Sequence, residues 1–170
     1  MIRRLKSNYR LYRGSNFPYC FQKRSRYPYD VLLGVGGNIG DVRRRFNHLF
    51  IYLQRSRFIE IIETAPILKN PPFGYLDQDD FYNSLIYVKT CLKPKALLRY
   101  ILSVEDRFGR KRLFQDAPRT LDIDIIFYEE VMMKSKQLIL PHYGWRQRDS
   151  VLLPLSMMKS AYPREQYAKR

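Results

Sequence analysis

The apolar residues of this chain alternate between two spacings, and that alternation limits the folds the chain can adopt. A spacing of two, or a short apolar run, indicates a strand, and a spacing of three to four indicates one face of a helix. The order strand, helix, strand, strand, helix, strand predicts an α+β, ferredoxin-like sheet with two helices on one face. A small hairpin and a C-terminal helix should follow. The expected strands are 30–35, 57–64, 81–90 and 121–128, the helices 41–55 and 93–108, the hairpin 129–140 and the last helix 145–158.

The size of the chain favours one domain with a real core. Its 170 residues are 45% hydrophobic, and a folded chain of this length buries roughly two-thirds of the surface it exposes when unfolded. The two cysteines cannot form a disulfide framework, and no apolar run approaches the roughly 20 residues of a membrane-spanning helix. We therefore expect one domain over residues 30–159, a cytoplasmic location and no membrane partner.

The ends of the chain are basic. Lys and Arg total 31 against 16 Asp and Glu, a net charge of +15, and residues 1–29 hold eight basic residues and no acid. A segment without apolar periodicity cannot offset its ordering entropy by burial, so we expect a mobile basic arm over 1–29. We treat residues 160–170 as a basic tail. The arm has four open interpretations: a solvated tail, a targeting segment, a tyrosine-rich nucleic-acid binder, or an artefact of the chosen start site.

Two aspartates stand one residue apart in the fourth expected strand. Asp122 and Asp124 should point to the same face, about 7 Å apart along the strand, while Ile123 and Ile125 point into the core. Adjacent acids repel each other, so basic side chains or a hard cation such as Mg²⁺ must compensate them. The alternative is an exposed strand whose solvated acids pair with nearby arginines.

A cationic loop precedes this acid pair. It contains Arg110, Lys111 and Arg112, and Arg119 lies three residues before Asp122. Acids and arginines together are typical of phosphorus-group transfer from a nucleotide, because such transfer depends mainly on positioning and charge stabilisation. A metal-dependent nuclease would share the acids. An RNA-binding module would share the fold but needs exposed aromatic rings on the central strands, and the acids repel a phosphate backbone. The sequence thus disfavours nucleic acid as a partner.

An asparagine inside the third expected strand is a second candidate for binding. Asn83 is disfavoured in strands and needs hydrogen-bond partners when buried. A planar heterocycle with donors and acceptors would satisfy it, and Phe81 on the same face could stack on such a ring. Alternatively, Asn83 bonds a neighbouring loop. Glu105 and His142 also have structural interpretations, as a surface acid and as an ordinary packed histidine.

Short motifs in a fixed order extend this interpretation over most of the chain. They are Gly36-Gly37-Asn38, Glu63-Thr64, Gln78, Phe81-Tyr82-Asn83, Leu97-Leu98, Val104-Glu105, Gly109-Arg110, the run from Pro118 to Ile125, Pro141-His142-Tyr143, Arg148 and the run from Val151 to Leu155. Through them, residues 31–158 resemble the family of 6-hydroxymethyl-7,8-dihydropterin pyrophosphokinases, enzymes of folate biosynthesis. The resemblance implies a ferredoxin-like fold and attack of the pterin hydroxymethyl oxygen on the β-phosphorus of ATP, which releases AMP.

The resemblance also implies a role for each matched residue. Asp122 and Asp124 would bind two Mg²⁺ ions that bridge the phosphates of ATP, and Arg110 and Arg119 would assist transfer. We expect the chain to be a monomer whose partners are the small molecules ATP and hydroxymethyl-dihydropterin. The nucleotide would be held by Glu105, Ile125, His142, Tyr143 and Arg148, and the pterin by Thr64, Ile67, Phe81 and Asn83.

One position departs from the family pattern. The family usually has an aromatic residue shortly after the arginine that matches Arg148, and this chain has Ser150 there. Two alternatives follow: Trp145 replaces this aromatic residue, or the pterin ring is held less tightly.

Overall fold

The computed structural model of the chain describes residues 6–21 and 24–168. The helices are α1 (Val42–Gln54), α2 (Pro94–Arg107), α3 (Asp149–Ser156) and α4 (Ala161–Ala168), with a 3₁₀ turn at Trp145–Gln147. The strands are β1 (Arg10–Tyr12), β2 (Tyr19–Cys20), β3 (Tyr29–Gly37), β4 (Ile59–Thr64), β5 (Ile67–Asn70), β6 (Phe81–Thr90), β7 (Asp122–Tyr128), β8 (Met133–Lys134) and β9 (Ile139–Leu140).

Local signals in the sequence explain where the two long helices begin. The Asp41 carboxylate accepts a hydrogen bond from the backbone N–H of Arg44 at 3.0 Å and so caps α1. Pro94 occupies the first turn of α2, where a missing backbone donor costs nothing. Both helices therefore lie close to their predicted positions.

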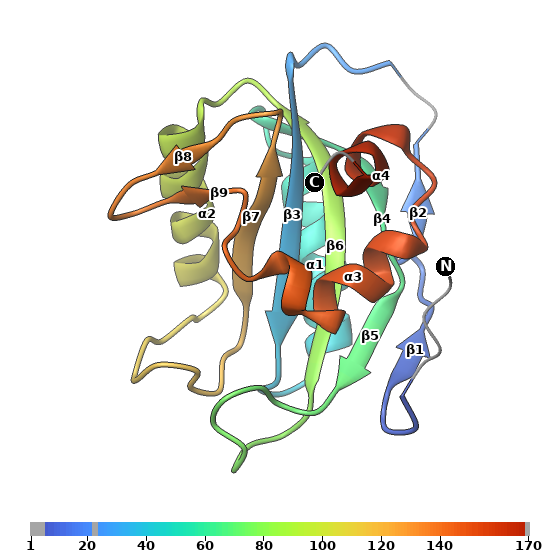
Figure 1. Cartoon of the computed structure of the whole chain (residues 1–170), viewed down its shortest axis with the longest axis vertical. Helices are drawn as coiled ribbons and strands as arrows, with labels where there is room; N and C mark the ends of the chain where they lie inside the picture. The colour runs from blue at the N-terminus through green and yellow to red at the C-terminus, as the bar shows by residue number, and fades with distance from the viewer. Residues whose placement is uncertain (1–5, 22–23, 169–170) are drawn as a thin grey trace.

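The main sheet is antiparallel in all its described pairings. β3 pairs with β6 on one side and β7 on the other, while β4 and β5 pair with different parts of the remaining edge of β6. The order β4-β6-β3-β7, with α1 and α2 as the connecting helices, is the ferredoxin-like arrangement (Figure 1). β8 and β9 form the separate hairpin. The predicted fold class is confirmed.

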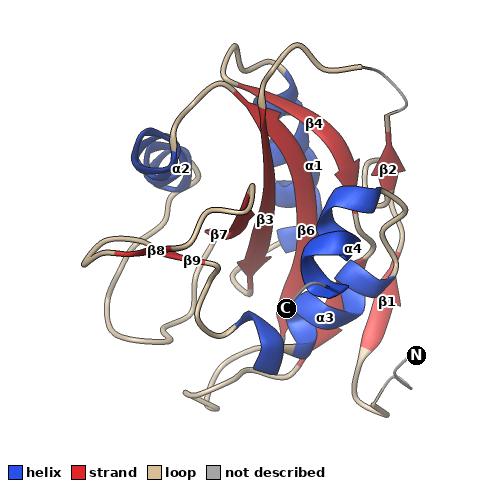
Figure 2. Cartoon of the chain, turned by 45° about the horizontal axis from the view of Figure 1, so that its top comes forward, coloured by secondary structure: helices blue, strands red, loops and turns tan. Residues whose placement is uncertain are grey.

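Each face of the sheet has its own apolar core. Val31 and Leu33 point toward α1 and α2, whereas Leu32 and Leu85 belong to the core on the other side, with α3. Figure 2 shows α1 behind the sheet and α3 and α4 in front of it. α4 differs from the predicted basic tail over 160–170, because the ring of Tyr162 stacks on Tyr87 with centroids 5.4 Å apart. Within the described residues, no helix has the length and apolar character of a membrane span.

The amino-terminal segment also differs from its prediction. Instead of forming a mobile arm, β1 pairs with β5 and β2 pairs with β4. Phe17 is 0% exposed and packs against Phe46 and Phe50, with ring centroids 5.7 and 6.3 Å away. This segment is ordered by pairing with distant strands and by the burial of Phe17. Neither interaction requires a periodic pattern of apolar residues within the segment. Residues 1–5 and 22–23 lie outside the described residues.

This packing predicts that Phe17 stabilises the whole domain. Phe17→Ala should lower the free energy of unfolding by about 3–5 kcal/mol, because it opens a cavity in the core. Urea denaturation followed by circular dichroism measures this value. Phe73→Ala is the matched control, since Phe73 is 84% exposed and its loss should change stability by about 0.5 kcal/mol or less. Equal effects of the two substitutions would contradict the placement of the segment in the core.

Candidate active site

Three chain segments leave the sheet at the same end. They are the end of β3, the 71–80 loop after β5 and the 108–121 loop before β7 (Figure 1). A cavity of about 380 Å³ lies on the α3 side of this end. Its lining includes Phe81, Asn83, Arg119, Asp122, Asp124 and Arg148, so the structure brings together six of the predicted site residues.

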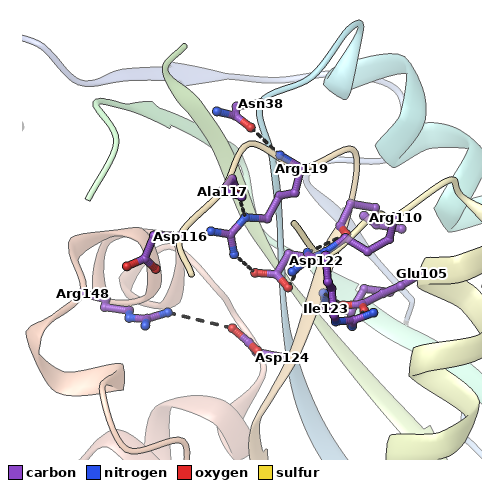
Figure 3. Close-up of polar contacts among 12 residues, drawn as sticks. Asn38, Glu105, Arg110, Asp116, Ala117, Arg119, Asp122, Ile123, Asp124 and Arg148 are labelled. Carbon is purple, nitrogen blue, oxygen red and sulfur yellow. Dashed lines mark hydrogen bonds and ion pairs between the residues drawn. The ribbon is translucent and has the colours of Figure 1, made fainter. Parts of the chain in front are cut away.

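Asp122 is held between two arginines (Figure 3). Arg110 Nη1 lies 2.7 Å from its Oδ1, and Arg119 Nη1 lies 2.6 Å from its Oδ2. Arg110 also donates to the carbonyl of Leu121, and Arg119 to that of Ala117, at 2.9 and 3.1 Å. These charge-assisted bonds fix both guanidinium groups beside Asp122. Arg119 lines the cavity, whereas Arg110 does not. The predicted juxtaposition of acids and arginines is therefore present.

Asp124 has looser cationic neighbours. Its Oδ2 lies 3.8 Å from His142 Nε2 and 3.9 Å from Arg148 Nη1, beyond the length of a good hydrogen bond. Desolvation by the surrounding protein, followed by the charge of Asp122, raises the pKa of Asp124 to about 7. Within residues 6–21 and 24–168, the second carboxylate of the pair therefore lacks a close cation of the kind that Asp122 has.

His142 contributes little positive charge. Burial, and then the positive charge of Arg148, lower its pKa to about 4, so the ring is neutral at pH 7. Its Nδ1 accepts a hydrogen bond from the backbone N–H of Gly144 at 3.2 Å, which leaves the proton on Nε2. The ring of Tyr143, a residue 73% exposed, stacks on His142 with centroids 4.9 Å apart. Tyr143 therefore covers one face of the His142 ring, whose Nε2 lies 3.8 Å from Asp124.

Asn83 and Phe81 line the other part of the cavity. Asn83 Nδ2 donates to Asn70 Oδ1 at 2.8 Å, and a Cβ on Gly36 would lie 2.7 Å from Asn83 Oδ1. Only glycine at residue 36 leaves room for this amide. The guanidinium carbon of Arg119 lies 5.2 Å from the centroid of the Phe81 ring. An amide and a ring thus face the same space, in line with a planar heterocycle as ligand.

Asn38 joins the segments around the cavity, a role that residue-by-residue inspection missed. Its Nδ2 donates to Gln78 Oε1 and to the carbonyl of Asp79. Its Oδ1 accepts from the N–H of Arg119 (Figure 3). Gln78 in turn donates to the carbonyl of Asp116 at 3.0 Å. Both Asn38 and Gln78 belong to the short motifs that carry the family resemblance. Those motifs did not indicate that the two side chains would contact each other.

Glu105, which we expected to contact the nucleotide, is buried and does not line the cavity. It is 1% exposed, its Oε1 accepts from the N–H of Ile123 at 2.7 Å, and its Oε2 pairs with Arg112. Burial is the main reason that its pKa is raised. As the structure stands, Glu105 ties the beginning of β7 to the basic loop.

Several other expected site residues have side chains outside the cavity lining. Ile67 and Ile125 belong to the core under α1 and α2. The Thr64 hydroxyl is fully buried, donates to the carbonyl of Asn16 and accepts from the N–H of Tyr19. Trp145 packs edge-on against Phe127 in the α3-side core, so it does not take the place expected beside Ser150.

The acid pair fits a hard divalent cation. Mg²⁺ prefers oxygen ligands and is usually held by one or two carboxylates together with substrate phosphates and water. Asp122 and Asp124 lie on one face of β7 at the cavity. No group of three or more ligating side chains occurs in residues 6–21 and 24–168. A cation held here by the two aspartates would therefore complete its coordination with water and substrate oxygens.

Sequence comparisons agree with this chemistry. A family profile described as 7,8-dihydro-6-hydroxymethylpterin-pyrophosphokinase matches residues 32–160. The chain is 40% identical over 153 residues to the 2-amino-4-hydroxy-6-hydroxymethyldihydropteridine pyrophosphokinase of Helicobacter pylori. The aligned region covers 89% of this chain and 94% of the relative. It is 38% identical over 142 residues to the enzyme of that name from Campylobacter jejuni, and this alignment covers 84% of this chain and 90% of that relative. The chain belongs to the 7,8-dihydro-6-hydroxymethylpterin pyrophosphokinase family.

Proposed function

We propose that this chain is an ATP-dependent pyrophosphokinase of folate biosynthesis. The hydroxymethyl oxygen of 6-hydroxymethyl-7,8-dihydropterin attacks the β-phosphorus of ATP. The bond from that phosphorus to the oxygen shared with the α-phosphate breaks, and AMP leaves. The observation that carries the proposal is the acid pair with two bound arginines, set beside an amide and a ring, in a member of this family.

The arginines would stabilise charge that develops during transfer. Arg110 and Arg119 are preorganised by Asp122 and by backbone carbonyls, so they need little rearrangement when a triphosphate arrives. Preorganised cations are the main contribution a protein makes to phosphorus-group transfer. Arg148, at the beginning of α3, would hold the nucleotide from the opposite side of Asp124.

Asp122 and Asp124 would hold magnesium ions, and two ions are proposed. When bound, such ions neutralise phosphate charge and orient the phosphates. Asp124 supports this role because, in the described part of the chain, it is approached by His142 and Arg148 at 3.8 and 3.9 Å and not by a closely bonded cation. We propose that His142 and Tyr143 offer the nucleotide a flat surface. The side chains of Glu105 and Ile125 are buried. These two residues would therefore contribute to nucleotide binding by positioning the backbone around them.

The pterin would lie against Asn83 and Phe81. A reduced pterin carries several ring donors and acceptors, which match the amide of Asn83, and Phe81 supplies a stacking surface. Thr64 and Ile67 would support this wall from behind, because Thr64 pairs with Ile86 of β6 and Leu68, next to Ile67, pairs with Asn83. The RNA-binding alternative has no comparable support, since acids rather than aromatic rings occupy this face of β7.

The direct test is pterin-dependent formation of AMP. Purified chain, ATP, MgCl₂ and 6-hydroxymethyl-7,8-dihydropterin should give AMP and the pterin diphosphate in equal amounts, measured by chromatography. Reactions without pterin, or with EDTA in excess over MgCl₂, should give none. Formation of ADP, or of AMP without pterin, would contradict the proposal.

A substitution in the acid pair tests its catalytic role. Asp124→Asn should lower kcat by about 100-fold or more, because it removes a carboxylate that stabilises the transferring group through bound cations. Its melting temperature should stay close to that of the parent chain. Asp106→Asn is the matched control, since the Asp106 side chain is 70% exposed and kcat should be unchanged. Full activity in Asp124→Asn would exclude the assigned role.

The close approach of Gly36 to Asn83 gives a second test. In Gly36→Ala, the new Cβ would displace the Asn83 amide, so the KM for the pterin should rise about tenfold or more. Gly14→Ala is the control, because a Cβ on Gly14 meets no heavy atom within 4 Å. Steady-state kinetics with each substrate varied measures the effect. An unchanged KM in Gly36→Ala would remove Asn83 from the pterin site.

A further inference from the structure

The cavity has a wall that lies outside the matched part of the chain. Lys6, Asn8 and Tyr9 line it together with Phe81, Asn83 and the beginning of α3. The family profile begins at residue 32, so this wall is not part of the region that defines the family. It comes from the segment that the sequence alone indicated to be a mobile arm.

A compact polar cluster connects this wall to α3. Tyr9 Oη donates to Asp149 Oδ2 at 3.0 Å, and Lys6 Nζ lies 2.8 Å from the same oxygen. The N–H of Tyr9 donates to the carbonyl of Lys6 at 3.0 Å, which closes a turn over residues 6–9. The Lys6 ammonium also lies 5.3 Å from the centroid of the Tyr9 ring. Two donors from one turn thus converge on a single carboxylate.

The turn is fixed to the sheet rather than attached to it by one ion pair. β1 follows directly, and Arg10, Leu11 and Tyr12 pair with Lys69, Leu68 and Ile67 of β5. Further along, Phe17 is buried in the core, and Asn16 Nδ2 donates to Asn47 Oδ1 of α1 at 3.2 Å. Figure 1 shows β1 at the sheet edge beside β5. The turn therefore has a rigid base.

Asp149 lies at the end of α3 that faces the cavity, so its position affects the cavity lining. It is the first residue of α3 and lies between Arg148, whose Nη1 is 3.9 Å from Asp124, and Ser150. All three residues line the cavity. α3 packs on β5 and β6, the strands that carry Asn70, Phe81 and Asn83. Holding Asp149 in place therefore sets the distance between α3 and that part of the cavity.

We propose that Lys6 and Tyr9 are positioning residues for the pterin. Through Asp149 they fix the beginning of α3, and Tyr9 itself closes one side of the cavity. The inference rests on the proposed function and extends it to the amino-terminal segment. The pterin is the substrate concerned because the wall lines the cavity together with Phe81 and Asn83. Of the residues assigned to the nucleotide, Arg148 also lines this cavity, whereas His142 and Tyr143 do not.

Two substitutions at one residue test this role. Tyr9→Phe keeps the ring and loses the bond to Asp149, and it should raise the KM for the pterin about fivefold. Tyr9→Ala also removes the wall and should raise it about tenfold or more. In both variants, kcat should stay within about twofold of the parent value. The rise in the KM for the pterin should exceed any rise in the KM for ATP, which Arg148 at the beginning of α3 would transmit. Tyr27→Phe is the matched control, because its hydroxyl donates to the carbonyl of Arg57, and Tyr27 does not line the cavity.

The readouts separate this inference from the proposed function. Absence of AMP from the parent chain would refute the function. Pterin affinity, measured by fluorescence titration without turnover, would still report on Tyr9. Unchanged pterin KM and affinity in Tyr9→Ala would overturn the inference, as would an equal rise in Tyr27→Phe. A fall in melting temperature with unchanged pterin KM would show a purely structural role and would also overturn it.

Discussion

Repulsion between two carboxylates on one face of β7 is the constraint on which the site depends. Asp122 is neutralised by two arginines at 2.6 and 2.7 Å, and those bonds also fix the two guanidinium groups beside it. Among the described residues, the cationic groups paired with Asp124 lie 3.8 and 3.9 Å away, and its pKa is raised. The site is therefore organised on one carboxylate and left incomplete at the other, which suits a protein that takes up cations together with a charged substrate.

The fold brings these groups together by letting backbones approach closely. A Cβ on Gly37 would lie 2.6 Å from the carbonyl of Thr120, and one on Gly36 would lie 2.7 Å from Asn83 Oδ1. The end of β3 can therefore pass between the loop that carries Arg119 and the strand that carries Asn83. Asn38, directly after these glycines, forms hydrogen bonds with Gln78 of the 71–80 loop and with Arg119 of the 108–121 loop. Three neighbouring residues of β3 and its following turn thus set the geometry of the cavity.

Elements with a local signal could be predicted from the sequence, and those without one could not. The strand over Phe81–Thr90 and the acid pair on β7 were predictable because periodicity and spacing act within a few residues. β1, β2 and β5 were missed because their order comes from pairing across the chain and from the burial of Phe17. Trp145 was misplaced because an aromatic residue near a site satisfies the pattern whether it faces the cavity or the core. The contact of Tyr9 with Asp149 joins residues 140 apart, which no local pattern reports.

The most direct measurement is the location of the cations in a substrate complex. A crystal of the chain with Mn²⁺ in place of Mg²⁺, a non-hydrolysable ATP analogue and the pterin would give anomalous peaks at each ion. The account predicts ions within direct coordination distance of carboxylate oxygens of both Asp122 and Asp124, with the analogue's phosphates completing their ligands. Ions bound only by the nucleotide, with neither aspartate among their ligands, would contradict it.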